Sequence, residues 1–297
     1  MRIVHSKNRK SELTQDHSTD SFGHVSQRAL REVVERIAFP RHYLAERRAN
    51  LRARDLLADF LRDMGYAPTL QGEYDNIMVQ TESDGRPWLL LGAHYDSVPG
   101  TPGADDNGSA VAACLECARL VQEYQIASTM IVFFNREEDG LLGSKDFVES
   151  LKWDIEEAHI FEMVGFCSHA PDSQRMPPGV PGFLGPKVGD FLGLLSNRKS
   201  NAIAERLLTL ASSYVRDLPT LALKMYLGLE RVLGHLNRSD HAPFWKAGIP
   251  AIMWTDTAEF RNANYHQASD TPETLDYEFL MRVTQLAMTR ALLRGAS

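Results

Sequence analysis

Short apolar runs alternate along the chain with longer stretches in which apolar residues recur at every third or fourth position. A short uninterrupted apolar run is typical of a strand buried on both faces, whereas the three-and-four spacing is typical of an amphipathic helix. The predicted strands are residues 76–81, 88–92, 129–134, 159–164, 221–226 and 250–255. The predicted helices are residues 25–38, 43–64, 110–125, 143–151, 202–215 and 277–293.

The order of these elements predicts an α/β fold with one mixed, mostly parallel central sheet sandwiched between helices. Strands that alternate with helices are joined by crossover connections, which place neighbouring strands parallel. We expect residues 23–297 to form a single domain. Residues 167–200 are rich in Gly, Pro and Ser and are expected to be a loop insertion over the site. Residues 1–22 are polar and are expected to be a mobile N-terminal arm.

The overall charge narrows the range of partners. The 297-residue chain has a formal net charge of −7 and a pI near 5.8, so it lacks the basic surface that nucleic acids and acidic membranes attract. It has no apolar run of about 18 residues for a spanning helix, and its polar N-terminus has no signal-peptide core. We therefore expect a cytoplasmic protein with no nucleic-acid or membrane partner.

Cysteine usage gives no disulfide framework. The three cysteines cannot all pair with one another, and Cys114 and Cys117 lie on the apolar side of one predicted helix. A zinc site there would need two more ligands, so we expect both to be buried free thiols.

Candidate chemistry is densest in residues 89–113, where an apolar run, a Gly/Pro-rich loop and an acidic cluster follow one another. His94 and Asp96 leave the predicted strand on the same side, because alternate strand residues share a face. A metal-bound His commonly gives its other ring N–H to a carboxylate, and this pair fits that arrangement. Asp105 and Asp106 stand where capping residues begin a helix. Taken singly, capping and core packing explain these residues as well.

Further acids and a second histidine follow the other predicted strands. Ligands of parallel α/β sheets bind beyond the carboxyl ends of the strands, so side chains at several such ends are expected to meet. The residues collected in this way are His94, Asp106, Glu137, Glu138, Glu162 and His266.

Four segments around these residues resemble the zinc-dependent aminopeptidase family, which also includes glutaminyl cyclases and the transferrin-receptor ectodomain. They read GAHYDSVPGTPGADDNGSA, NREEDGLLGS, FEMVG and YHQASDTPETLD. The segment SDHAPFWKAGIPAIM, at residues 239–253, is similar to the family's segment before its last ligand. The match keeps the family's order across residues 40–293.

The resemblance implies a pair of zinc ions bridged by Asp106. Glu138 and His266 would complete one ion, and His94 and Glu162 the other. Three carboxylates bring a charge of −3 to two divalent ions, and a bridging hydroxide neutralises the positive charge that is left. Imidazole and carboxylate ligands suit zinc, and carboxylate-rich sites also admit manganese or cobalt.

The resemblance also assigns two catalytic residues. Glu137 would be the general base, because it lies beside a ligand and can move a proton from water to the leaving amine. Asp96 would orient His94. The better-known aminopeptidases have Asp where this chain has Glu162, which puts the spacing and occupancy of the second metal in question.

Other polar residues have open roles. Asp105 and Asp240 fit either helix capping or an orienting role behind the ligands, and His241 fits a structural histidine better than a ligand. Several donors are candidates for stabilising a tetrahedral oxyanion. They are Tyr265, His235, Arg238 and Arg261, of which Arg261 fits an exposed surface residue equally well.

We therefore expect a zinc-dependent metallo-exopeptidase, an aminopeptidase that acts on a peptide or aminoacyl substrate with a free N-terminus. The first alternative is a zinc acyl-transfer enzyme like glutaminyl cyclase, which in that relative uses one zinc. The second is a noncatalytic binding module, which has no need of a base beside a complete ligand set. The sequence leaves the preferred residue and the oligomeric state open.

Overall fold

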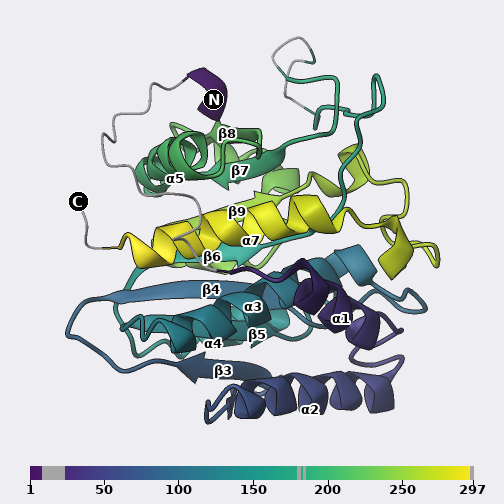
Figure 1. Ribbon diagram of the computed structural model, residues 1–297, viewed down its shortest axis with the longest axis vertical. Helices are drawn as coiled ribbons and strands as arrows, with labels where there is room; N and C mark the ends of the chain where they lie inside the picture. Colours follow the sequence, from purple (N-terminus) through teal and green to yellow (C-terminus); the bar gives the residue numbers. More distant parts are fainter. Residues whose placement is uncertain (9–23, 179–181, 183–184, 295–297) are drawn as a thin grey trace.

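The computed structural model describes residues 1–8, 24–178, 182 and 185–294, and within them one mixed sheet of nine strands has helices on both faces (Figure 1). The strand order is β1-β8-β7-β9-β6-β4-β5-β3-β2. The strands are β1 (Arg2–His5), β2 (Thr69–Gln71), β3 (Asn76–Gln80), β4 (Trp88–His94), β5 (Thr129–Phe134), β6 (Ile155–Phe161), β7 (Leu192–Ser196), β8 (Thr220–Lys224) and β9 (Ala251–Thr255). This arrangement confirms the predicted α/β class.

Parallel pairing dominates the centre of the sheet. Strands β5, β4, β6 and β9 run parallel, and every residue of β4 and β5 is buried, as their uninterrupted apolar runs predict. Antiparallel pairs join β3 to β5, β7 to β9 and β1 to β8. The carboxyl ends of the central strands therefore meet at one edge.

Helices bury two separate apolar cores against the sheet. The larger core joins Leu30 of α1, Leu57 of α2 and Leu207 of α5 to residues of α3 and α7, and Figure 1 shows α3 and α7 crossing that face. The smaller core holds Phe147 of α4 and Phe244 of α6 on the other face. The helices are α1 (Gln27–Ile37), α2 (Arg47–Asp63), α3 (Ala110–Glu123), α4 (Leu142–Glu149), α5 (Asn201–Tyr214), α6 (His241–Ala247) and α7 (Tyr277–Leu292).

Two sequence predictions for the body of the domain differ from the structure. The strand expected at 159–164 begins earlier and ends at Phe161, so Glu162 follows the strand instead of lying inside it. The prediction of a surface loop for 167–200 is wrong for Leu192–Ser196, which forms β7 between β8 and β9, because pairing on both sides compensates for its Gly-rich surroundings. Residues 179–181 and 183–184 of that segment lie outside the described part.

The N-terminal segment, expected to be a mobile arm, contributes a strand at its start. Arg2–His5 pairs with β8 at the edge of the sheet, with Ile3 opposite Leu223. Residues 9–23 lie outside the described part of the chain. A strand of four residues is too short to show an apolar–polar pattern of its own, so its pairing with a distant segment could not be predicted from the sequence.

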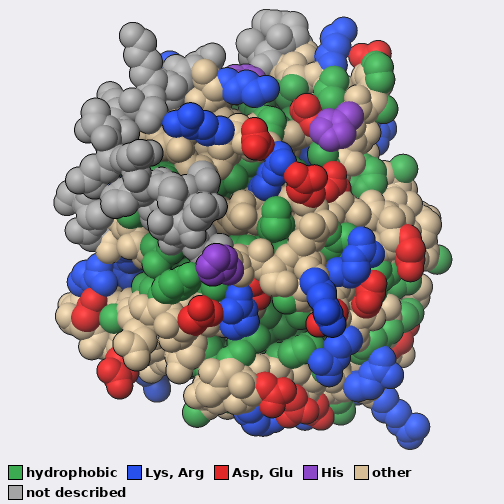
Figure 2. Space-filling view, in the orientation of Figure 1, with side chains coloured by type: hydrophobic (Ala, Val, Ile, Leu, Met, Phe, Trp, Pro, Cys, Tyr) green, Lys and Arg blue, Asp and Glu red, His purple; other side chains and the backbone are tan. Residues whose placement is uncertain are grey.

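One expectation from composition is confirmed by the structure. Cys114 and Cys117 are free and buried in α3, as predicted. On the face seen in Figure 2, basic and acidic side chains are interspersed. In the described ranges, no helix is both long and apolar enough to span a bilayer.

Candidate metal centre

The structure brings the predicted site residues together at the carboxyl ends of the parallel strands. His94 ends β4 and Glu162 follows β6 directly. Asp106 lies in the turn that leads into α3, and the Glu137–Glu138 pair follows β5. His266 arrives from the loop before the short 3-10 helix Pro272–Thr274.

The carboxylate of Asp106 faces two histidines at once. Its Oδ1 lies 3.5 Å from Nε2 of His94, and its Oδ2 lies 3.1 Å from Nε2 of His266. The Oε2 of Glu162 is 3.5 Å from His94 Nε2, and the Oε2 of Glu138 is 3.7 Å from His266 Nε2. The five side chains thus form two groups that share one carboxylate.

The contacting atoms have the separations and chemistry of zinc ligands. Two ligands of a tetrahedral zinc, each about 2.0–2.2 Å from the ion, lie about 3.4 Å apart. Both ring nitrogens of His94, Oδ1 of Asp106 and Oε1 of Glu138 are buried without a hydrogen-bond partner among the described residues. Unpaired buried polar atoms are costly, and a cation that they ligate removes that cost. These residues therefore fit divalent metal ions.

Asp96 connects the two halves of the site. Its fully buried carboxylate accepts hydrogen bonds from the backbone N–H groups of Glu137 at 3.2 Å and Glu138 at 3.3 Å. Its Oδ1 also lies 3.5 Å from Nδ1 of His94. One side chain thus sets the turn after β5 and faces the histidine at the end of β4.

The loop that carries Asp106 is held from two sides. Gly103 has a φ of +62°, and a Cβ there would lie 2.4 Å from the carbonyl oxygen of Asp106, so a larger residue would displace the loop. The carboxylate of Asp270 accepts from the backbone N–H groups of Asp105 at 2.8 Å and Asp106 at 3.1 Å. The side chain of Asp105 accepts from Asn262 at 2.7 Å.

These supporting residues are what the sequence analysis missed. Asp270 lies within the segment that carries His266, but the pattern alone gives it no partner. The fully buried Arg41 was also missed, and its guanidinium donates to the carbonyl oxygens of Tyr95 at 2.7 Å and Gly103 at 2.9 Å. Burial lowers the pKa of Arg41 to about 10. Because this value is still well above neutral pH, Arg41 remains positively charged beneath the acidic cluster.

Neither Asp105 nor Asp240 makes a side-chain capping hydrogen bond, although Asp240 stands at the N-cap position of α6. Asp105 is bonded to Asn262 instead, and Asp240 is fully buried with no capping hydrogen bond. Burial raises the pKa of Asp240 to about 7. His241 lies 2.9 Å from the carbonyl oxygen of Leu236, and burial lowers its pKa to about 4, as expected for a neutral structural histidine.

Excess negative charge sets the electrostatics of the site. Burial, reinforced by neighbouring carboxylates, raises the pKa values of Glu137 and Glu138 well above their ordinary range. Burial opposes ionisation of Asp106 too, but the rings of His266 and His94, which face its two oxygens, lower its pKa below the ordinary value. Burial disfavours the imidazolium of His94, yet the surrounding carboxylates raise its pKa. The cluster therefore favours a bound cation.

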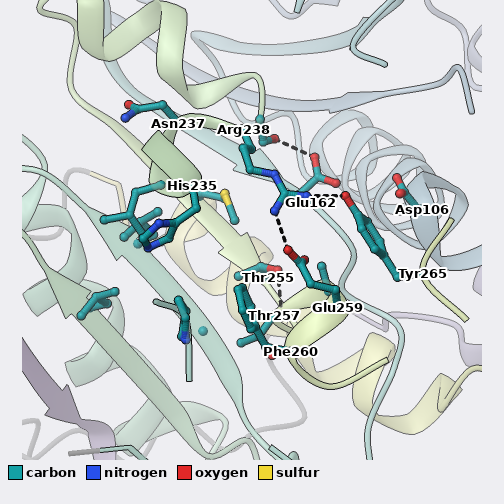
Figure 3. A pocket seen from close by; sticks show the side chains of 18 of the residues that line it. Asp106, Glu162, His235, Asn237, Arg238, Thr255, Thr257, Glu259, Phe260 and Tyr265 are labelled. Atoms are coloured by element: carbon teal, nitrogen blue, oxygen red, sulfur yellow. Dashed lines mark hydrogen bonds and ion pairs between the residues drawn. The ribbon is translucent and has the colours of Figure 1, made fainter. Parts of the chain in front are cut away.

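A cavity of about 530 Å³ opens beside these residues. Tyr265, Arg238 and His235 line it together with Asp106 and Glu162 (Figure 3). The Tyr265 ring is stacked on His266 with centroids 3.7 Å apart, and its hydroxyl accepts a hydrogen bond from Arg238 Nη2 at 2.7 Å. Arg238 also pairs with Glu259 across the cavity wall (Figure 3).

Arg261 is not a surface residue. It is buried, and it donates to the side-chain oxygen of Gln174 at 3.0 Å and to the carbonyl oxygen of Phe166 at 3.3 Å. Of the four sequence candidates for an oxyanion donor, Arg261 is thus outside the cavity lining and the other three are in it.

One apolar row forms part of the cavity wall. Met253 of β9 is opposite Leu195 of β7, Leu195 is opposite Leu223 of β8, and Leu223 is opposite Ile3 of β1. All four line the cavity. The cavity therefore extends from the candidate metal ligands over four strands to the edge of the sheet.

Comparison with known proteins adds independent information. A family model described as Peptidase family M28 matches residues 76–291. The uncharacterized protein YfbL of Escherichia coli (strain K12) is 34% identical over 240 residues, which are 75% of this chain and 72% of YfbL. The LapA aminopeptidase of Legionella pneumophila has the same fold, with a TM-score of 0.73 at 16% identity over 98% of this chain and 79% of LapA. BSAP, a zinc aminopeptidase from Bacillus subtilis, has a TM-score of 0.56 at 25% identity over 74% of this chain and 49% of BSAP.

Proposed function

This chain belongs to peptidase family M28, as its motifs suggest, and from that premise we propose that it is an aminopeptidase with two zinc ions. The observation that carries the proposal is the position of Asp106, whose two carboxylate oxygens face different histidines. One carboxylate can bridge two ions only if further ligands lie beside each of its two oxygens. Glu138 and Glu162 supply those partners on either side.

The residues that would hold the ions are divided between two sites. His266 and Glu138 would hold one ion with Asp106, and His94 and Glu162 the other. The Oε2 of Glu162 accepts a hydrogen bond from Ser239 at 2.6 Å, which fixes the longer arm that replaces the family's Asp. When bound, two divalent ions lower the pKa of a water and polarise the scissile carbonyl.

Glu137 is the proposed general base. One of its oxygens lies within 4.8 Å of a ring nitrogen of His94 and of a carboxylate oxygen of Glu162, so Glu137 reaches the proposed reaction centre. Its backbone is fixed by Asp96, and burial raises the pKa of its carboxyl, which suits a group that must hold a proton between two transfers. It takes a proton from the attacking water and gives it to the leaving amine.

Tyr265 is the proposed donor to the tetrahedral oxyanion. Its hydroxyl accepts from Arg238, so its own proton remains available to donate. Stacking on His266 holds the Tyr265 ring beside the candidate ligands. Burial and the nearby carboxylate of Asp106 raise the pKa of Tyr265, so its hydroxyl keeps its proton. A donor fixed in advance stabilises developing charge without reorganisation.

The substrate is proposed to enter with its free ammonium toward the acids. Glu137 and Glu162 are the nearest carboxylates, and in a partly dry site they attract a cation more strongly than in bulk water. The apolar row from Met253 to Ile3 is suited to apolar side chains of the peptide. We expect Leu, Met or Phe substrates to be cleaved faster than Asp or Glu substrates.

The direct test compares free and N-acetylated forms of one leucyl peptide, with zinc per chain measured in parallel. A charge-assisted contact is worth about 1.5–3 kcal/mol, and exclusion of the acetyl group adds to it, so we expect acetylation to slow cleavage by at least about 10²-fold. Equal rates on both forms would contradict an aminopeptidase. Ammonia release from an N-terminal glutamine peptide without cleavage would assign a glutaminyl cyclase, and binding without turnover would assign a binding module.

A further inference from the structure

A cysteine and a histidine lie on one face of an extended segment beyond the catalytic acids. Ser168 forms an antiparallel bridge with Gly189, and its N–H donates to the Gly189 carbonyl oxygen at 2.8 Å. Residues two apart in an extended segment point the same way, so Cys167 and His169 are neighbours. Their Sγ and Nε2 atoms are 3.8 Å apart.

A carboxylate from a distant part of the chain completes this group. Asp276 is the N-cap of α7, and its Oδ1 accepts from the N–H groups of Glu278 at 3.0 Å and Phe279 at 2.9 Å. Its own N–H donates to the carbonyl oxygen of Gly165 at 2.9 Å, which anchors it beside the extended segment. One ligand atom each from Cys167, His169 and Asp276 lie within 4.8 Å of one another.

The remaining nitrogen of the histidine faces another carboxylate. Nδ1 of His169 lies 3.9 Å from Oδ2 of Asp190, which follows the bridge residue Gly189. Metal-bound histidines almost always present their second ring nitrogen to a carboxylate, carbonyl or water, which fixes the tautomer. The neighbourhood of His169 has this pattern.

We infer that Cys167, His169 and Asp276 form a further zinc site, separate from the M28 centre, with Asp190 orienting His169. A sulfur and a nitrogen bound to one tetrahedral zinc lie about 3.5 Å apart, close to the observed separation. A thiolate favours zinc over magnesium, calcium or manganese. Three protein ligands leave the fourth position to water.

Binding is coupled to release of a proton. A cysteine binds zinc as the thiolate, so Cys167 must lose its thiol proton. Zinc binding forms the Zn–S bond and gives the thiol proton to solvent, so affinity rises with pH.

The expected role is to join two segments that support the catalytic acids. Gly165 donates its backbone N–H to Oδ1 of Asp105 at 3.0 Å, and Asp105 precedes the bridging ligand Asp106. A metal between Cys167 and Asp276 ties this segment to the start of α7. The expected site thus ties two segments together, and none of its three ligands belongs to the M28 centre.

Cobalt(II) reports this site separately, because the ligands proposed for the M28 centre include no sulfur. In the full chain stripped of metal, we expect cobalt titration to give a near-ultraviolet thiolate–cobalt band whose final intensity corresponds to one thiolate-bound cobalt per chain, in addition to the cobalt taken up by the M28 centre. Cys167→Ser abolishes that band, and Asp190→Asn weakens cobalt binding by about 10–100-fold. His169→Ala removes a ligand and weakens cobalt binding further. His169 is largely exposed, so its variant keeps the proposal testable if the serine variant fails to fold.

Two controls separate this site from the others. Glu138→Gln, which weakens the M28 centre, retains the band, and so does Cys117→Ser in the buried helix α3. A band that survives Cys167→Ser, or its absence in folded protein at saturating cobalt, would overturn the inference. A protein with the band but without metal at the M28 centre would instead contradict the proposed function alone.

Discussion

The adjacent residues Glu137 and Glu138 allow the proposed roles of base and ligand to be separated by two matched amide substitutions. Glu137→Gln preserves shape and leaves the backbone N–H that bonds Asp96 intact. Loss of a general base costs about 10²–10⁴-fold in kcat, which corresponds to about 2.7–5.4 kcal/mol at 1.36 kcal/mol per tenfold. We expect this loss with zinc content unchanged.

Glu138→Gln is the matched control. It removes a carboxylate whose Oε2 lies 3.7 Å from His266 Nε2, so zinc content should fall together with activity. The two variants are compared by metal analysis and by steady-state kinetics on a leucyl chromogenic substrate. Full activity of Glu137→Gln, or loss of its metal with Glu138→Gln still loaded, would refute the assignment of the pair.

Three further outcomes are expected. Asp106→Asn removes one charge shared by both groups of ligands, so metal analysis should find both ions lost; a chelator should inactivate the parent and added zinc restore it. Tyr265→Phe should lower kcat about 10²–10³-fold with little change in KM, and an unchanged kcat would exclude the hydroxyl as a donor. Burial opposes ionisation of Glu157, but His159, Arg290 and Arg206 lower its pKa to about 2 from 4.5. Because the pKa of Glu157 is lower in the folded state than in the unfolded state, the ionised carboxylate stabilises the fold. This contribution is present above pH about 4.5 and is lost as pH falls toward 2. Denaturation at pH 7 should find Glu157→Gln about 3 kcal/mol less stable, and equal stability would contradict the buried pair.

Several features of the site were readable from the sequence because they depend on local patterns. An uninterrupted apolar run shows where β4 ends, so His94 at its end and Asp96 just beyond it are expected on the same side of the strand. The same logic places the Glu137–Glu138 pair beyond β5. The resemblance of the surrounding segments to the family's motifs then suggested roles that residue type alone leaves open.

Other features depend on contacts between segments that are far apart in the chain. β7 is a short Gly-containing run that is stable because β8 and β9 pair with it on both sides, and no periodicity within Leu192–Ser196 carries that information. β1 is stabilised in the same way at the edge of the sheet. Pairing energy belongs to two strands together, so neither strand predicts it alone.

The sequence by itself thus determined which residues are the candidate ligands and the strand ends at which they lie, because these properties depend on side-chain chemistry and on hydrophobic runs. Only the tertiary structure decided which oxygen of Asp106 faces which histidine and that Asp270 holds its loop. It alone brought Asp276 beside Cys167. Hydrogen bonds and ligand geometry depend on distances of a few ångström between groups that the chain order leaves far apart, and only the packed fold sets those distances.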